Sequence, residues 1–169
     1  AYNPPAFRAG TQQGSQCFMM AEPVSLELDG VATRVFMANE TGFDPYTTVL
    51  ATRRAYLESN RSECEAMVRA FSRGWSAYLD SPEKANEAMS KLNPGMSMQA
   101  MKLSAEKQRS LIMDKETARI GLGGMTRERW QTLAEQLHSL ELIKAVPDVE
   151  AVFVWDAVAG SDSSTNSGG

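Results

Sequence analysis

A stripe of apolar side chains at helical spacing runs through residues 61–79 and sets the first limit on the fold. The stripe consists of Cys64, Met67, Val68, Phe71, Trp75 and Tyr78. Steps of three and four residues place these side chains on one face of an α-helix, and Asn60 is a suitable N-cap. Such a face needs other elements to cover it, so we expect a packed core that includes Trp75.

Two more helices are expected directly after this one. Ser81 followed by Pro82 predicts a helix start, because the missing N–H of proline is harmless in a first turn. This second helix ends at the sequence Asn-Pro-Gly of residues 93–95. A third helix is predicted from Ser97 to about Asp114, since apolar residues again recur on one face.

A fourth helix is predicted over residues 126–142, with Thr126 as its N-cap. Its apolar stripe consists of Trp130, Leu133, Leu137 and Leu140. His138 lies at the edge of this stripe, so we expect it to be exposed and inert. The glycines of residues 121–124 lack the spacing of a phosphate-binding loop, so this segment is interpreted as a turn between helices.

Four short segments have the β-branched and aromatic composition of strands, namely residues 16–20, 33–38, 47–52 and 152–155. Three of them lie in the first third of the chain, and the helices follow. The predicted fold class is therefore α/β, with helices packed on a small sheet.

Composition excludes several classes of function. The chain has 169 residues and a net charge of −4, whereas a nucleic-acid-binding surface needs a basic excess. No apolar run approaches the roughly 18 residues of a membrane-spanning helix, so we expect no direct membrane insertion. With one histidine and two cysteines, the sequence predicts no metal site, no cofactor and no catalytic residues. Both cysteines are expected to be buried thiols.

Two polar segments are candidates for binding a small ligand. Gln12, Gln13, Gln16 and Glu22 lie just before and just after a predicted strand, where Pro23 is expected to break the structure. Their amide and carboxylate groups can hydrogen-bond a small molecule, although an ordinary polar loop is the alternative. The second segment is Gly-Phe-Asp-Pro-Tyr at residues 42–46, where a turn is expected before a strand that begins near Tyr46.

Taken in order, four segments resemble the C-terminal half of ABC-transporter solute-binding proteins of the thiamine-precursor, nitrate and sulfonate class. They are AGTQQGSQCFMMAEPVSLELDG, VFMANETGFDPYTTVLATRRAYLESN, EAMVRAFSRGWSAYLDSPEKANEAMSKLNP and GGMTRERWQTLAEQLHSLELI. They cover roughly residues 9–154. Each motif alone is weak, but the ordered set is hard to produce by chance.

The resemblance implies a two-lobe fold of the type II periplasmic-binding-protein kind, of which this chain resembles only the C-terminal portion. It further implies that residues 1–46 end the ligand lobe and cross between lobes, and that residues 47–158 form a strand and the C-terminal helices of the other lobe. Residues 159–169 lack large apolar side chains and are expected to form a disordered tail. A periplasmic or extracytoplasmic location comes from the resemblance alone.

The function implied by the resemblance is capture of a small polar molecule, such as nitrate, a sulfonate, taurine or a thiamine-pyrimidine, for an ABC permease. Gln12, Gln13, Gln16, Glu22 and Tyr46 would then contact the ligand. Two alternatives remain open. One is an enzyme of the thiamine-pyrimidine synthase kind, which shares the fold but calls on a ligand-site histidine and a cysteine-rich segment that this chain lacks. The other is a helical module that binds another protein.

Overall fold

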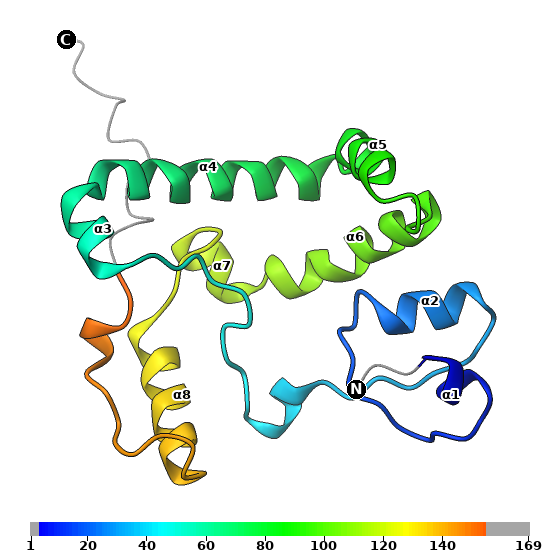
Figure 1. Ribbon diagram of the computed structural model, residues 1–169, viewed down its shortest axis with the longest axis horizontal. Helices are drawn as coiled ribbons and strands as arrows, with labels where there is room; N and C mark the ends of the chain where they lie inside the picture. The colour runs from blue at the N-terminus through cyan, green and yellow to red at the C-terminus, as the bar shows by residue number, and fades with distance from the viewer. Residues whose placement is uncertain (1–3, 155–169) are drawn as a thin grey trace. The chain divides into compact units, whose positions relative to one another are not determined.

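The computed structural model describes residues 4–154, and every regular element within them is a helix (Figure 1). The α-helices are α1 (Pro4–Arg8), α2 (Glu22–Leu28), α3 (Arg54–Ser59), α4 (Arg61–Asp80), α5 (Glu83–Leu92), α6 (Met98–Ile112), α7 (Lys115–Ile120) and α8 (Arg127–Ser139). Two short 3-10 helices are η1 (Ala38–Thr41) and η2 (Val149–Ala151). None of the helices in this part of the chain combines the length and the apolar character needed to cross a membrane.

The four predicted helices are confirmed as α4, α5, α6 and α8. The expected cap of α8, Thr126, is also present, and Ser97 caps α6 in the same way. The Ser97 hydroxyl accepts a hydrogen bond from the Ala100 N–H at 3.1 Å, and the Thr126 hydroxyl accepts one from the Arg129 N–H at 3.4 Å. These bonds satisfy N–H groups that the first turn of a helix leaves without partners. The glycine-rich segment 121–124 joins α7 to α8, so its interpretation as a turn is confirmed.

The predicted α/β class and its small sheet are wrong, because residues 4–154 form no strand. Residues 31–37 and 43–53 have no regular structure, and apolar side chains there are open to solvent, with Phe36 72% and Leu50 49% exposed. A strand is stabilised by hydrogen bonds to a neighbouring strand. Neither segment has such a neighbour among the described residues, so strand-like composition alone does not produce a sheet. Residues 152–154 are likewise not a strand, and Trp155 lies outside the described part.

The region around Pro23 differs from its prediction for a local reason. Residues 16–18 have no regular structure, and residues 19–21 form a turn instead of completing a strand. The Phe18 N–H donates to the Glu22 carboxylate at 2.9 Å, and the Ala21 N–H donates to the Phe18 carbonyl at 2.8 Å. Pro23 then lies in the first turn of α2, where a proline is tolerated. The proline therefore starts a helix here and does not end a strand.

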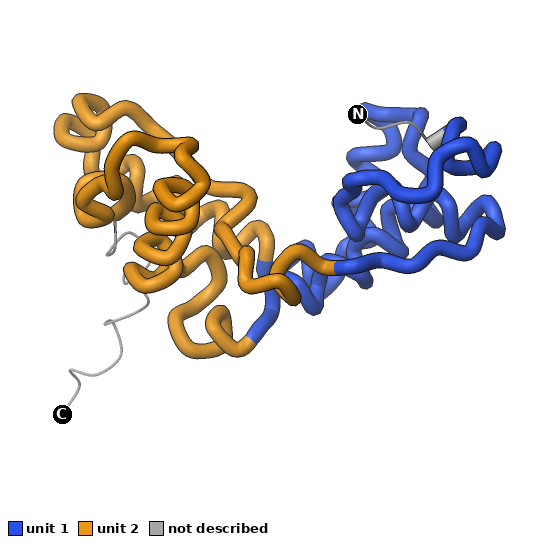
Figure 2. The backbone as a smooth tube through the Cα atoms, turned by 90° about the horizontal axis from the view of Figure 1, so that it is seen from below, with its two compact units in different colours: residues 1–36, 76–114 blue, residues 37–75, 115–169 orange. Residues whose placement is uncertain are grey.

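The described chain divides into two compact units (Figure 2). Unit 1 contains residues 1–36 and 76–114, and unit 2 contains residues 37–75 and 115–169. The predicted boundary at residue 46 stays a prediction. The expected tail at residues 159–169 lies outside the described residues.

Unit 1 is held together by the packing of α2 and α5 against α6. Its buried apolar side chains are Val24, Leu26, Leu79, Met101 and Ala105. The buried Asn86 amide accepts a hydrogen bond from the Tyr78 hydroxyl at 3.1 Å, so this polar group keeps a partner away from water. An ion pair of 2.8 Å between Lys107 and Glu27 joins α6 to α2 at the surface.

Unit 2 has its own core around α8 and η2. Ala134, Val149 and Phe153 are buried together, and Met125 and Trp130 pack against them. The Trp130 ring stacks on Phe153 with 5.5 Å between ring centroids. The expectation that Trp130 is a packing residue is therefore confirmed.

The apolar stripe of α4 is only partly covered. Within the described chain Met67 is 61% and Phe71 41% exposed, while Trp75 is half-buried. Phe71 contacts Trp75 edge to face, with 6.2 Å between centroids. The helix is correctly predicted, but the expected burial of its whole face is wrong at these two positions.

Candidate functional site

The glutamines predicted to bind a ligand lie on the loop of unit 1 between α1 and α2. The Gln12 side chain donates to the Gly14 carbonyl at 2.8 Å, so it shapes the loop itself. Gln13 and Gln16 are exposed, and their side-chain amides make no hydrogen bond within the described residues. Phe18 on the same loop is 64% exposed. The loop therefore presents two amides and an aromatic ring to solvent.

Glu22 closes this loop at the start of α2. Its carboxylate accepts the Phe18 N–H at 2.9 Å, and a negative side chain in a helical first turn also interacts well with the helix dipole. Partial desolvation by neighbouring atoms, and then the negative charge of Glu22, raise the pKa of the nearby Cys17 thiol. Cys17 is a free, exposed cysteine, so the expectation that it is buried is wrong, and its thiol stays protonated at neutral pH.

The cation nearest in sequence to this loop is already paired. The Arg8 guanidinium forms an ion pair with Asp29 and donates to the Ser25 hydroxyl at 2.9 Å. A carboxylate, that of Glu22, lies at the other end of the loop. The charges around the loop therefore oppose binding of a small anion.

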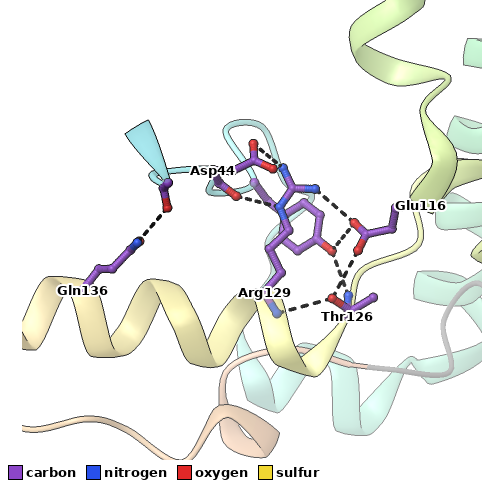
Figure 3. Close-up of polar contacts among 7 residues, drawn as sticks. Asp44, Glu116, Thr126, Arg129 and Gln136 are labelled. Carbon is purple, nitrogen blue, oxygen red and sulfur yellow. Dashed lines mark hydrogen bonds and ion pairs between the residues drawn. The ribbon is translucent and has the colours of Figure 1, made fainter. Parts of the chain in front are cut away.

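Tyr46 lies in unit 2. It belongs to a network of polar side chains, of which Asp44, Glu116, Thr126 and Arg129 are labelled in Figure 3. Its hydroxyl donates to the Glu116 carboxylate at 2.9 Å and accepts the Thr126 N–H at 2.8 Å. Arg129 is bonded to the same Glu116 carboxylate at 3.0 Å. It also donates to the Asp44 carboxylate at 2.9 Å and to the Asp44 carbonyl at 2.6 Å. Three segments of the chain thus meet at one arginine and one tyrosine.

Ionisation in the network follows from these contacts. Burial raises the pKa of Tyr46, the Thr126 hydrogen bonds oppose that rise, and the Glu116 carboxylate adds to it. Burial alone would lower the pKa of Arg129, but the hydrogen bond to Glu116 and the charge of Asp44 raise it above its ordinary value. Tyr46 is therefore neutral and Arg129 charged at physiological pH. Neither group is suited to act as a base.

Hydrogen bonds fix the Tyr46 hydroxyl, and contacts with Arg129 and Trp130 fix its ring. The Arg129 guanidinium lies 4.2 Å from the ring centroid, which is a cation–π geometry. The Trp130 ring, which stacks on Phe153, also contacts the Tyr46 ring, with 6.0 Å between the centroids. The ring and the hydroxyl of Tyr46 are thus both engaged within the protein.

A shallow pocket of about 100 Å³ borders this network. Its lining residues are Gly42, Asp44, Pro45, Arg129, Thr132, Leu133 and Gln136. Gln136 is already bonded to the Gly42 carbonyl at 2.9 Å across it. Pockets for organic ligands usually have about 300–1,000 Å³. This pocket is too small for such a ligand, so the network serves to tie residues 42–46 to α8.

Glu116 and Arg129, which are central to this network, are not among the site residues predicted from the sequence. Arg129 and Asp44 are 85 residues apart in the sequence, and Glu116 and Tyr46 are 70 residues apart. Nothing in the local sequence marks such a contact. No group of three or more His, Cys, Asp or Glu side chains that could bind a metal occurs among residues 4–154.

Comparison with known proteins confirms the resemblance over part of the chain. Residues 7–85 match the family model described as NMT1/THI5 like. All five predicted site residues lie within this match. The riboflavin-binding protein RibY of Chloroflexus aurantiacus is 27% identical over 146 residues, which are 85% of this chain and 41% of the relative. The chain thus spans about two fifths of that relative's length. No solved structure matches the chain.

Proposed function

From the NMT1/THI5-like segment of residues 7–85, we propose that this chain is part of a solute-binding protein that captures a small polar molecule. The family match is the observation that carries the proposal. The matched residues include the α1–α2 loop and Tyr46, which contain all the predicted ligand contacts. The protein binds its ligand without bond chemistry. It acts outside the cytoplasm and delivers the ligand to an ABC permease in the membrane. No cofactor is required.

Within this function, the charges favour a heteroaromatic ligand over an anion. Nitrate, a sulfonate or taurine presents a negative group that needs an unpaired cation. Arg8 is paired with Asp29, and Arg129 is paired with two carboxylates. A neutral or cationic ring of the pyrimidine or flavin kind instead needs stacking and amide contacts. The exposed Phe18 ring and the Gln13 and Gln16 amides supply these, and the name of the Chloroflexus relative supports the same class.

Ligand titration tests the proposal. Riboflavin, the thiamine pyrimidine, nitrate and taurine are titrated separately into the protein, with riboflavin fluorescence or heat as the signal. We expect one of the two ring compounds to bind and the two anions not to bind. Phe18→Ala should weaken ring binding roughly tenfold, as expected for loss of about 1.4 kcal/mol of stacking. Phe36→Ala is the matched control, since Phe36 is 72% exposed on another segment of unit 1. Tighter binding of an anion would contradict the ligand class.

A helical protein-interaction module is the second candidate function. It is favoured by the helical character of residues 4–154 and by exposed apolar side chains such as Met67 on α4. Failure of all four solutes to bind, together with formation of a stable complex with another protein of the same cell, would favour this candidate over solute capture.

A further inference from the structure

Ser104, in the middle of α6, donates a hydrogen bond outside its own helix. Its part-buried hydroxyl donates to the Met20 carbonyl at 2.6 Å, although the two residues are 84 positions apart in the sequence. Serine hydroxyls inside helices commonly bond a carbonyl of their own preceding turn. Ser90 on α5 and Ser110 on α6 do so, each donating to the carbonyl three residues earlier. The Ser104 bond is instead a contact between α6 and the segment that precedes α2, within unit 1.

The Met20 carbonyl belongs to the turn of residues 18–21, which ends the α1–α2 loop. The Ala21 N–H donates to the Phe18 carbonyl at 2.8 Å, and the Phe18 N–H donates to the Glu22 carboxylate at 2.9 Å. Glu22 is the first residue of α2, and α2 packs on α6. The bond from Ser104 therefore fixes the position on α6 of the turn that carries Phe18.

The fold of unit 1 does not depend on this hydroxyl. The neighbouring side chains of α6 that enter the core are apolar, with Met101 2% and Ala105 5% exposed. One turn further along α6, Lys107 forms a 2.8 Å ion pair with Glu27 of α2. Alanine at position 104 would keep these contacts and is a good helix former. Loss of the Ser104 hydroxyl should thus loosen the turn more than it disturbs the core.

The other end of the α1–α2 loop has an anchor of its own. The Thr11 and Gln12 N–H groups both donate to the Ala6 carbonyl, at 3.0 Å and 3.2 Å respectively. These bonds tie the start of the loop to α1 and do not involve α6. The two ends of the loop can therefore be loosened separately, and Ser104 acts on the end that carries Phe18.

We propose that Ser104 is a positioning residue for the ligand loop, because from α6 it holds the turn that presents Phe18. This inference rests on the proposed function, in which the loop binds a ring compound. A binding loop that is ordered before its ligand arrives has a smaller entropic cost of binding. The apparent dissociation constant rises as the fraction of chains with a competent loop falls. Because Ser104 acts through the loop, its loss lowers the association rate and leaves the dissociation rate unchanged.

Hydrogen exchange of single amides, followed by NMR, tests the positioning role without a ligand. In Ser104→Ala we expect the Phe18 and Ala21 N–H groups to exchange about fivefold faster or more, because local opening of the turn becomes easier. The Thr11 and Gln12 N–H groups should exchange as in the unmodified chain. Equal rates for Phe18 and Ala21 in the two proteins would overturn the proposal. Equal acceleration at both ends of the loop would also overturn it, because the effect would then be a general loss of stability.

Two further variants control for changes in the helix itself. Ser110→Ala removes a serine hydroxyl from the same helix, where it bonds only its own helix, and should leave exchange in the loop unchanged. Ser104→Thr keeps a hydroxyl at position 104 and should restore slow exchange of the turn. Far-UV circular dichroism checks that each variant keeps its helix content. An effect of Ser110→Ala equal to that of Ser104→Ala would contradict a specific role for Ser104.

Binding kinetics test the consequence for the ligand. Riboflavin or the thiamine pyrimidine, whichever the unmodified chain binds, is mixed with each variant in a stopped-flow experiment. Ser104→Ala should lower the association rate about three- to tenfold with little change in dissociation, whereas Phe18→Ala should speed dissociation. An unchanged association rate in Ser104→Ala overturns the proposal. If the unmodified chain binds neither compound, the proposed function fails, and the hydrogen-exchange comparison still decides whether Ser104 holds the turn.

Discussion

At the residue scale, the Tyr46 hydroxyl makes two hydrogen bonds within unit 2, because it donates to Glu116 and accepts from the Thr126 N–H. Tyr46→Phe removes both bonds and leaves a part-buried N–H without a partner. We expect the free energy of unfolding to fall by about 1–3 kcal/mol. Tyr56→Phe is the control, since the Tyr56 hydroxyl bonds Glu63 at an exposed site. It should cost at most about 0.5 kcal/mol. Urea denaturation measures both, and equal effects would contradict the role of Tyr46.

The same contacts predict a loss of stability at alkaline pH. Burial raises the pKa of Tyr46 above its ordinary value of 10.0, with Glu116 adding to the rise. A raised folded-state pKa contributes stability that is complete below pH 10.0 and is lost as pH rises through the folded pKa. Tyrosinate absorbance should show Tyr46 ionising above pH 10.0 in the folded chain. The pKa values of Tyr56 and Tyr78 are raised as well, so Tyr46→Phe should reduce this late component by the amplitude of one tyrosine and should not abolish it. Titration of every tyrosine at its ordinary pKa would contradict the burial.

Glu22→Gln tests whether Glu22 contacts a ligand or only closes its loop. The side-chain oxygen of glutamine can still accept the Phe18 N–H, so we expect the melting temperature without ligand to change little. Loss of the negative charge should weaken binding of a ring compound roughly ten- to a hundredfold, if the carboxylate pairs with a ring N–H or amine. Calorimetric titration and a thermal melt of the same variant separate the two roles. Lower stability with unchanged affinity would remove Glu22 from the site.

Local sequence identified some of these residues and could not identify others. Glu22 and Pro23 stood out because a proline beside a carboxylate is visible in the sequence, although their place at a helix start was missed. Thr126 was correctly predicted as a cap because capping depends on the next three residues. The pairing of Arg129 with Asp44 depends on how distant segments pack, and a single sequence carries no signal for it.

At the element scale, the C-terminal end of α8 contains an uncommon backbone conformation. Glu141 has φ 58°, within the left-handed region that favours glycine. The Glu141 N–H bonds the His138 carbonyl at 2.9 Å, and the Leu142 N–H bonds the Leu137 carbonyl at 2.9 Å, as in a Schellman motif. Glu141→Gly should therefore stabilise unit 2 by roughly 0.5–1 kcal/mol.

A control within the same helix gives the opposite sign. Glu135 is an exposed position inside α8, and Glu135→Gly should destabilise the unit by about 0.5–1 kcal/mol, because glycine is a poor helix former. Chemical denaturation of the two variants checks both signs. Destabilisation by Glu141→Gly would mean that its backbone conformation is not a source of strain.

The four longest helices, α4, α5, α6 and α8, were predicted correctly, whereas the short helices α1, α2, α3 and α7 were not predicted and the expected strands are absent from the described residues, for a physical reason. A helix satisfies its backbone hydrogen bonds within one segment, so the spacing of apolar residues and the caps of α6 and α8 are sufficient evidence. A strand needs a partner that the sequence of the segment does not specify. The segment of residues 33–38 has strand-like composition, yet it pairs with nothing in the described chain. The composition of residues 33–38 therefore indicates a preference for the strand conformation, but it does not determine the structure of the segment.

At the scale of the whole molecule, burial is divided between two small cores. The core of unit 1 lies where α2 and α5 pack on α6, and the core of unit 2 lies around α8 and η2. The buried side chains of each core come from a single unit. A small core supplies only a few kcal/mol of net stability. A single large-to-small substitution should therefore remove most of the stability of the unit that contains it.

Met101→Ala and Val149→Ala test this division, because these side chains are 2% and 1% exposed in unit 1 and unit 2 respectively. The methionine substitution should cost about 2–5 kcal/mol, and the valine substitution should also be strongly destabilising.

Trp75 and Trp130 both belong to unit 2, so in a Trp155→Phe background tryptophan fluorescence reports that unit, while circular dichroism reports all helices. Met101→Ala should lower the midpoint of part of the circular dichroism change and leave the fluorescence midpoint in place. Val149→Ala should lower the fluorescence midpoint. If Met101→Ala shifted both signals together, the two cores would unfold as one cooperative unit.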